Sequence, residues 1–135
     1  MEYSETIWDH YEHPRNVGSF SKNDPWVGTG MVGTPEQGDV MKLQIKVNDQ
    51  GVIEDACFRA YGCGASIACA SLVTEWVKGK TLEQARDVKN AQIAEALSLP
   101  PIRIFCAVLA EDVVKAAIRD YTTKRGCADA ASYLY

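Results

Sequence analysis

Hydrophobic and polar residues alternate along the first half of the chain, as they do in β-strands. Between residues 41 and 47 apolar side chains alternate with Lys and Gln side chains, and a second alternation runs from Ala56 to Tyr61. The residues 48–51, Asn-Asp-Gln-Gly, have the composition of a tight turn. The pattern therefore predicts a half-buried strand joined to a second strand as an antiparallel hairpin.

The register of this hairpin follows from pairing the residues that face the core. Met41 is then expected opposite Phe58, and Asp39 is expected opposite Ala60. This register brings Asp39 close to Cys63, which follows the second strand in the sequence.

Helical periodicity replaces the alternation in the second half. One apolar stripe comprises Ala65, Ala68, Cys69, Leu72, Val73 and Trp76 and ends at the C-cap residue Gly79. A longer stripe, which predicts the longest helix, comprises Cys106, Leu109, Ala110, Val113, Val114, Ala117 and Tyr121. Shorter helices are predicted from the N-cap Ser4 to before Pro14, from the capping box that begins at Thr81, and from Asn90.

Strands followed by helices are typical of an α+β domain with helices packed on one face of a small antiparallel sheet. No repeat, low-complexity segment or linker divides the chain. We therefore predict a single domain over residues 1–125. Residues 126–135 lack a pattern and are predicted to form a mobile tail.

The charge balance and the hydropathy exclude several classes of protein. The 135 residues include 14 Lys and Arg against 18 Asp and Glu, a formal net charge of -4. A nucleic-acid partner is not expected, because phosphate binding requires a clustered positive field. No apolar run approaches the roughly 18 residues of a membrane span, and the N-terminus lacks the basic start of a signal peptide. We expect a soluble, cytoplasmic protein without a membrane partner.

The cysteines are the main candidates for chemistry. There are five, an odd number, and thiols stay reduced in the cytoplasm, so a fully paired disulfide framework is excluded. Cys63, in Tyr61-Gly62-Cys63-Gly64, lies between a strand and a helix, and Cys106 lies near the start of the longest helix. A helix start favours the thiolate, which binds metals and attacks sulfur. The alternative is that both are small buried hydrophobic residues, as free cysteines often are.

Asp39 is the third candidate, because the hairpin register brings it close to Cys63. A carboxylate beside a thiolate is repulsive unless a cation joins the two, so a metal ion would account for the pairing. The alternative is that Asp39 accepts backbone N–H hydrogen bonds in the turn after Gly38.

The other cysteines are assigned by their elements. Cys69 lies within a helical stripe and is expected in the core. Cys57 lies on the sheet face opposite Phe58 and is expected to be exposed or covered by a partner. Cys127 lies in the predicted tail.

Two further patterns resemble functional motifs. His10 and His13 are one turn apart at a helix end, where surface capping is favoured over metal binding, and a nucleophilic pair of Cys63 with His10 is a weaker alternative. The segment from Gly28 to Gly33 has the spacing G-x-G-x-x-G, but a dinucleotide site requires a helix directly behind it. Here a strand follows, so we expect a glycine-rich edge strand and loop.

Several colinear segments resemble the IscU-type scaffold proteins on which iron-sulfur clusters are assembled, a family that includes the N-terminal domain of NifU. The resemblance runs from Tyr3 to about Arg125. The segments are Asp9-His10-Tyr11-Glu12, Pro14-Arg15-Asn16, Gly38-Asp39-Val40-Met41-Lys42-Leu43-Gln44, Tyr61-Gly62-Cys63-Gly64, Thr74-Glu75-Trp76-Val77-Lys78-Gly79-Lys80 and Ile93-Ala94-Glu95.

The resemblance implies a three-stranded antiparallel sheet with helices on one side and a cluster site at one tip. Asp39, Cys63 and Cys106 match the positions of cluster ligands in the family. The segment Leu99-Pro100-Pro101-Ile102-Arg103 resembles the family's L-P-P-V-K segment, which a DnaK-type chaperone binds to promote cluster release. The J-type co-chaperone of that chaperone is a further implied partner.

The departures from the family lie at the site itself. Gln37 stands where the family has a cysteine, and Phe105 stands where it has a histidine. A [2Fe-2S] cluster prefers four thiolate ligands, whereas one chain here offers two matched thiolates and one carboxylate.

Two functional hypotheses follow from the resemblance. The first is a variant scaffold that binds a [2Fe-2S] cluster, iron or zinc. Its ligand shell is completed by another copy of the chain, a partner or an exogenous thiol. Cys63 or Cys106 accepts persulfide sulfur from a cysteine desulfurase. The second is an adaptor or regulator of iron-sulfur assembly that holds no cluster. The retention of Asp39, Cys63 and Cys106 favours the scaffold. In either case the chain is not expected to be an enzyme.

Overall fold

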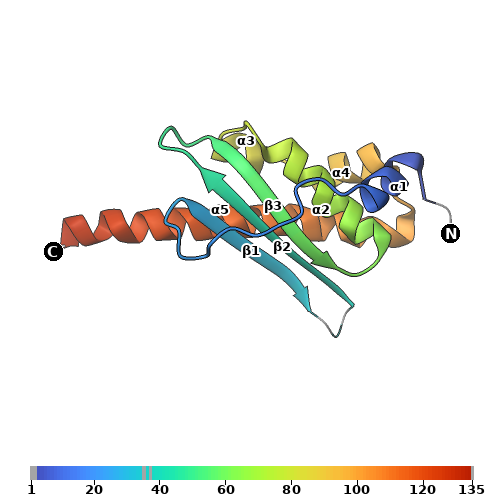
Figure 1. Ribbon diagram of the computed structural model, residues 1–135, viewed down its shortest axis with the longest axis horizontal. Coiled ribbons are helices and arrows are strands. Elements are labelled where there is room, and N and C mark those ends of the chain that lie inside the picture. Colours follow the sequence, from blue (N-terminus) through green and yellow to red (C-terminus); the bar gives the residue numbers. More distant parts are fainter. Residues whose placement is uncertain (1–2, 35, 37, 135) are drawn as a thin grey trace.

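The computed structural model describes residues 3–34, 36 and 38–134, with the side chains of residue 34 and residues 126–134 left out of the description. Figure 1 shows a twisted sheet with helices behind it. The elements are α1 Glu5–Glu12, β1 Val27–Thr34, β2 Asp39–Val47, β3 Ile53–Tyr61, α2 Gly64–Val77, α3 Leu82–Arg86, α4 Asn90–Leu97, the 3-10 turn η2 Pro101–Arg103, and α5 Ile104–Leu134.

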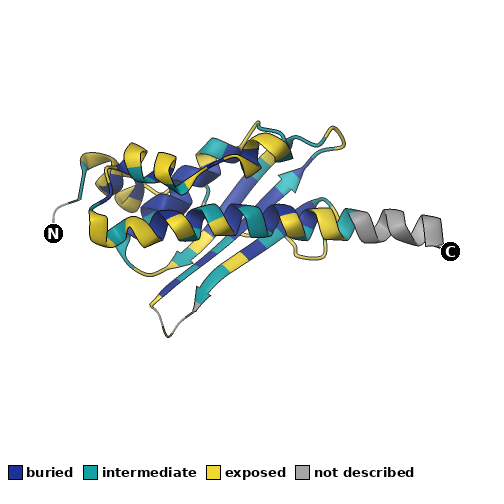
Figure 2. Ribbon diagram, turned by 180° about the vertical axis from the view of Figure 1, so that it is seen from behind, coloured by how far each residue is buried: buried dark blue, intermediate teal, exposed yellow. Residues whose placement is uncertain are grey.

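The predicted fold class is confirmed. The strands form an antiparallel sheet in the order β1-β2-β3. Helices α2 and α5 lie against one face of this sheet, as the views from the front and from behind agree (Figures 1 and 2). No helix among the described residues has both the length and the apolar character that a membrane span requires.

The predicted hairpin register is wrong by two residues. Met41 pairs with Ala60 rather than with Phe58, and Leu43 pairs with Phe58. The first pair after the turn joins Val47 to Ile53, one residue further along the second strand than the turn pattern predicts. An irregularity between Lys46 and Val47 displaces the second strand by one more residue. Because the shift is even, each side chain keeps its predicted face.

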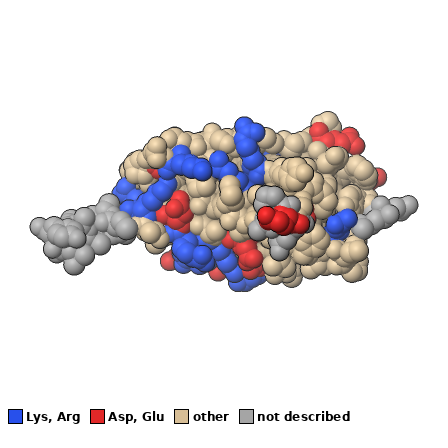
Figure 3. Space-filling model, turned by 90° about the horizontal axis from the view of Figure 1, so that it is seen from below, with Lys and Arg blue, Asp and Glu red and all other residues tan. Residues whose placement is uncertain are grey.

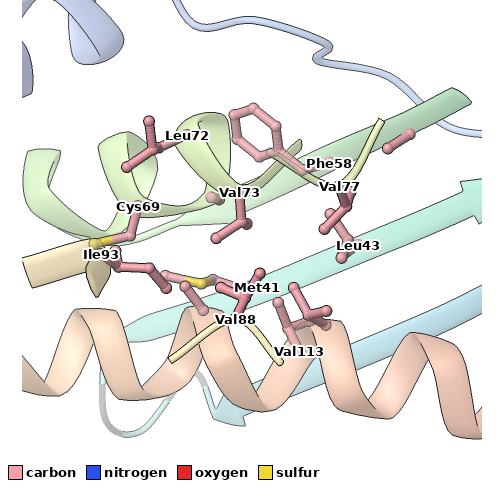
Figure 4. Packing of buried hydrophobic residues seen from close by; sticks show 14 of the residues in the cluster. Met41, Leu43, Phe58, Cys69, Leu72, Val73, Val77, Val88, Ile93 and Val113 are labelled. Carbon is pink, nitrogen blue, oxygen red and sulfur yellow. The ribbon is translucent and has the colours of Figure 1, made fainter. Parts of the chain in front are cut away.

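The core fills the space between the sheet and the helices (Figure 4). Met41 and Leu43 from β2 meet Cys69 and Val73 from α2 and Val113 from α5, all of them buried. The helical stripes predicted from the sequence therefore face the sheet, and Cys69 is confirmed as a core residue.

The glycine-rich segment is the edge strand β1, as predicted, and α5 crosses directly over it. A Cβ at Gly28 would lie 2.3 Å from the carbonyl oxygen of Ala117, and a Cβ at Gly30 would lie 2.4 Å from that of Val113. These glycines serve the close approach of strand and helix. The element that follows β1 is another strand, as expected for a segment that is not a dinucleotide motif.

The N-terminal segment of the chain pairs with the free edge of β3 and covers part of the other face of the sheet. The N–H of Phe58 donates to the carbonyl of Asn16, and the N–H of Gly18 donates to the carbonyl of Phe58. Beneath this segment Cys57 is only 5% exposed, so the prediction of an exposed or partner-covered thiol is wrong. Gln44 is also buried there, and its side-chain oxygen accepts the N–H of Phe20. The segment therefore shields from solvent these two residues, which lie on the face that the alternation predicts to be exposed.

Helix α5 continues as far as Leu134. The segment 126–134, predicted to belong to a tail, therefore lies in this helix, and the side chain of Cys127 is outside the description.

Candidate metal site

Three elements begin at the same end of the sheet and bring the predicted site residues together. Asp39 is the first residue of β2, Cys63 is the N-cap of α2, and Cys106 lies in the first turn of α5. Because these three element starts lie at the same end of the sheet, residues that are distant in sequence become neighbours.

The distances confirm the predicted proximity of Asp39 and Cys63, although the register behind that prediction is wrong. The backbone N–H of Cys63 donates to Oδ1 of Asp39 at 3.3 Å. Since Val40 pairs with Tyr61, Asp39 lies beside the residues that follow β3. The Sγ atoms of Cys63 and Cys106 are 3.8 Å apart. A carboxylate and two thiols therefore meet at one point.

Gly62 is required for this approach. It has a φ of +149°, and a Cβ at this position would lie 2.2 Å from Oδ1 of Asp39. Only a residue without a side chain lets the carboxylate come this close to the start of α2.

Ser66, which the sequence analysis does not include, lies at the centre of the group. Its hydroxyl donates to Oδ1 of Asp39 at 2.5 Å. The same oxygen lies 3.3 Å from Sγ of Cys106 and 3.5 Å from Sγ of Cys63. One fully buried hydroxyl thus contacts all three predicted site residues. The spacing of three residues from Cys63 on a helix, which places both on one face, is the signal that could have revealed it.

The two thiols differ in accessibility. Cys63 is partly exposed, whereas Cys106 is completely buried, and this burial raises the pKa of the Cys106 thiol to about 12. The contact with Ser66 acts in the opposite direction but does not outweigh the burial. Cys106 is therefore a protonated thiol at neutral pH, and the expectation that its helix start yields a reactive thiolate is wrong because desolvation dominates.

The substituted positions are only partly described. Gln37 lies outside the described residues. Phe105, next to Cys106, is 43% exposed and lies off the core stripe. Its ring belongs to a group of exposed apolar side chains around the start of α5, which includes Ile102, Ile104 and Val108. In Figure 3 the surface toward the N-terminal end is mostly uncharged, while most Lys and Arg side chains gather toward the other end.

The residues of segment 99–103, which resembles a chaperone-binding sequence, differ in their exposure to solvent. Leu99 is buried against the core, and Pro100 is partly buried. Pro101 and Ile102 are exposed, with Ile102 at 65%. Arg103 turns toward the thiols: the nearby Cys63 and then Tyr3 raise the pKa of its guanidinium, and its buried Nε has no hydrogen-bond partner among the described residues.

His10 is not a surface residue and does not join the site. Its ring is buried, with Nδ1 hydrogen-bonded to Oγ of Ser71 at 2.8 Å and Nε2 3.5 Å from Oε1 of Glu75. The hypotheses of surface capping by His10 and of a Cys63–His10 pair are wrong, because helix α1 turns this histidine toward α2. For His13 surface capping is confirmed, because this residue is the exposed C-cap of α1.

The donor set supports metal binding only in part. Across residues 3–34, 36 and 38–134, no three His, Cys, Asp or Glu side chains are arranged to hold a metal ion in common. Two sulfur atoms and a carboxylate are a suitable partial set for iron or zinc, but a [2Fe-2S] cluster prefers four thiolates. The described residues of one chain therefore leave the ligand shell incomplete.

Nearly the whole chain is similar to known proteins. The model of the NifU-like N-terminal domain matches residues 2–128. The chain is 66% identical over 125 residues to the iron-sulfur cluster assembly scaffold protein IscU of Escherichia coli (strain K12), covering 93% of this chain and 98% of the relative. It is 64% identical over 126 residues to the IscU scaffold protein of Azotobacter vinelandii, with the same coverage of both chains.

Solved structures share the fold. The N-terminal part of a nitrogen-fixing NifU-like protein from Brucella abortus superposes with a TM-score of 0.66 at 21% sequence identity. The match covers 90% of this chain and 94% of that protein.

Proposed function

The chain belongs to the family of NifU-like N-terminal domains, and from this premise we propose that it is an iron-sulfur cluster assembly scaffold whose cargo is held by Asp39, Cys63 and Cys106. The observation that carries the function is the identity of 66% to an IscU scaffold over nearly the full length of both chains. The convergence of the three side chains at one end of the sheet supports the choice of residues. The adaptor hypothesis is not favoured.

Cys63 is the acceptor of sulfur in this proposal. It is the partly exposed thiol of the pair, whereas Cys106 is buried and protonated. Sulfur arrives as the persulfide of a cysteine desulfurase. The Cys63 thiolate attacks the terminal sulfur, a new S–S bond forms on Cys63, and the desulfurase thiolate leaves. The protein carries the product and acts as a scaffold rather than as a catalyst.

The cargo is a [2Fe-2S] cluster or iron, and zinc is a further metal ion that the same donors can bind. Because the described donors are too few for a cluster, the shell is completed by a second copy of the chain, a partner or an exogenous thiol. The exposed apolar side chains around Phe105 offer a surface beside the site for such a partner.

Release of the cargo involves a DnaK-type chaperone, which binds the segment from Leu99 to Arg103, together with its J-type co-chaperone. The exposure of Pro101 and Ile102 supports this role. A peptide with this sequence should bind the chaperone, and a peptide with Ile102→Asp should bind more weakly. Equal binding of both peptides would remove the inference.

Anaerobic reconstitution with ferrous iron, cysteine and a cysteine desulfurase tests the function. We expect visible absorption of a cluster and bound iron, both lost in Cys63→Ala. Cys57→Ala is the matched control, because this cysteine is free and buried outside the site. A protein that binds no iron, or that retains its cluster in Cys63→Ala, contradicts the proposal.

A further inference from the structure

We propose that Ser66 is a positioning residue of this site: its hydroxyl ties the Asp39 carboxylate to Cys63 and Cys106 and thereby sets the affinity of the site for a metal ion. The inference rests on the proposed function, because it takes these three residues as the ones that hold the cargo. Ser66 itself belongs to none of the segments that carry the family resemblance.

The direction of its hydrogen bonds makes Ser66 the link between the carboxylate and the thiols. The hydroxyl proton of Ser66 is donated to Oδ1 of Asp39. A hydroxyl has one proton and two lone pairs, so its contacts with the two sulfur atoms leave the oxygen as acceptor when the thiols are protonated. One hydroxyl therefore connects the Asp39 carboxylate to both sulfur atoms.

Ser66 also fixes the orientation of the Asp39 carboxylate. The hydrogen bonds that Asp39 accepts from the hydroxyl of Ser66 and from the N–H of Cys63 both fall on Oδ1. They fix the side chain of a residue that is only 8% exposed and direct it toward the thiols. A charged group that is buried in this way requires such hydrogen bonds.

The burial of Ser66 also points to a role in the site. Ser66 is completely inaccessible to solvent, and its oxygen has no role in capping or in a backbone turn among the described residues. Burying a polar group without a hydrogen bond is unfavourable, and within the described part of the chain the hydrogen-bond partners of this hydroxyl are all members of the site. Groups that orient metal ligands commonly change metal affinity by about 10- to 100-fold when they are removed.

Titration of the metal-free protein with Co²⁺ under reducing, anaerobic conditions tests the proposal. Cobalt bound by thiolates has charge-transfer absorption in the near ultraviolet and visible bands that report its coordination. We expect Ser66→Ala to weaken Co²⁺ binding by about 10- to 100-fold and to change the visible bands. Ser71→Ala is the matched control, because Ser71 is an equally buried serine of α2 that bonds to His10 rather than to the site.

A pair of variants with the same shape separates the hydroxyl from packing. Ser66→Thr keeps the hydroxyl and Ser66→Val does not, so the threonine variant should bind Co²⁺ more tightly than the valine variant. This comparison stands even if Ser66→Ala does not fold. Equal affinities of the threonine and valine variants, or an unchanged affinity in a folded Ser66→Ala, overturn the role of Ser66. Absence of the thiolate-to-cobalt absorption in the unaltered protein instead overturns the site itself.

Discussion

The sulfur atoms of Cys63 and Cys106 lie 3.8 Å apart, although 43 positions separate the two residues in the sequence. Both thiols are free, and one is partly exposed while the other is buried behind it. The contact is made by the starts of two helices that meet at the end of the sheet.

Mild oxidation should join these two cysteines. Diamide accepts the two thiol hydrogens, and only a small movement is needed to bring Cys63 and Cys106 to bonding distance. Peptide mapping by mass spectrometry under non-reducing conditions should identify this intramolecular disulfide. The oxidised protein should no longer take up iron until it is reduced.

The control is Cys69→Ser, which removes a buried thiol of the same helix that is not part of the contact and should leave this disulfide unchanged. Preferential pairing of Cys63 with any other cysteine would contradict the geometry.

Restoring the two family residues should increase the yield of bound cluster. Gln37→Cys with Phe105→His supplies a thiolate and an imidazole in addition to the described donors, which brings the ligand set closer to the four that a [2Fe-2S] cluster prefers. Visible absorption and the iron-to-protein ratio after anaerobic reconstitution measure the gain. If the yield and its dependence on added thiol stay the same, the incomplete ligand set is not what limits this protein.

A side chain at Gly30 should destabilise the packing of α5 on β1. The Cβ of Gly30→Ala would lie 2.4 Å from the carbonyl oxygen of Val113, so the helix must move away from the strand. We expect a loss of about 1 to 3 kcal/mol in the free energy of unfolding, measured by urea denaturation. Met31→Ala, at an exposed position of the same strand, should change it by no more than about 0.5 kcal/mol. Equal effects of both substitutions would show that the close approach does not matter.

Stability should fall as the pH decreases through the ordinary titration range of histidine. Burial, and then the charge of Arg15, lower the pKa of His10 below 6.5, while Glu75 and Asp9 act in the opposite direction. Below the unfolded pKa the unfolded chain binds a proton that the folded protein does not, so protonation favours unfolding. Urea denaturation between pH 7 and pH 5 measures the slope.

His10→Gln removes this titrating group and should flatten the pH dependence, although it also weakens the hydrogen bond to Ser71 and lowers stability at every pH. His13→Gln, one turn away at an exposed position, is the control. An unchanged slope in His10→Gln would contradict the assignment.

The amino-acid sequence by itself determined the elements and their faces. Alternation and helical periodicity depend on which side of an element is apolar, so they predict the hairpin, the helices and the α+β class without distant information. The same local chemistry identified Ser4 and Thr81 as helix caps, and both accept the expected backbone N–H. Helix starts and the pairing of the hairpin identified Cys63, Cys106 and Asp39 as candidates, and the family resemblance matched them to cluster ligands.

Only the tertiary structure decided which faces are covered and how the site is connected. Cys57 and His10 are buried because the N-terminal segment and helix α1 pack on elements distant in sequence. The two-residue register shift arises in the turn and at the irregularity beside Val47. A shift of two residues keeps every side chain on the same face, so the alternation of apolar and polar residues does not reveal it. Burial, which raises the pKa of Cys106, and the contacts of Ser66 depend on three elements meeting at one end of the sheet. Such long-range packing is set by the whole chain, and a local pattern does not contain it.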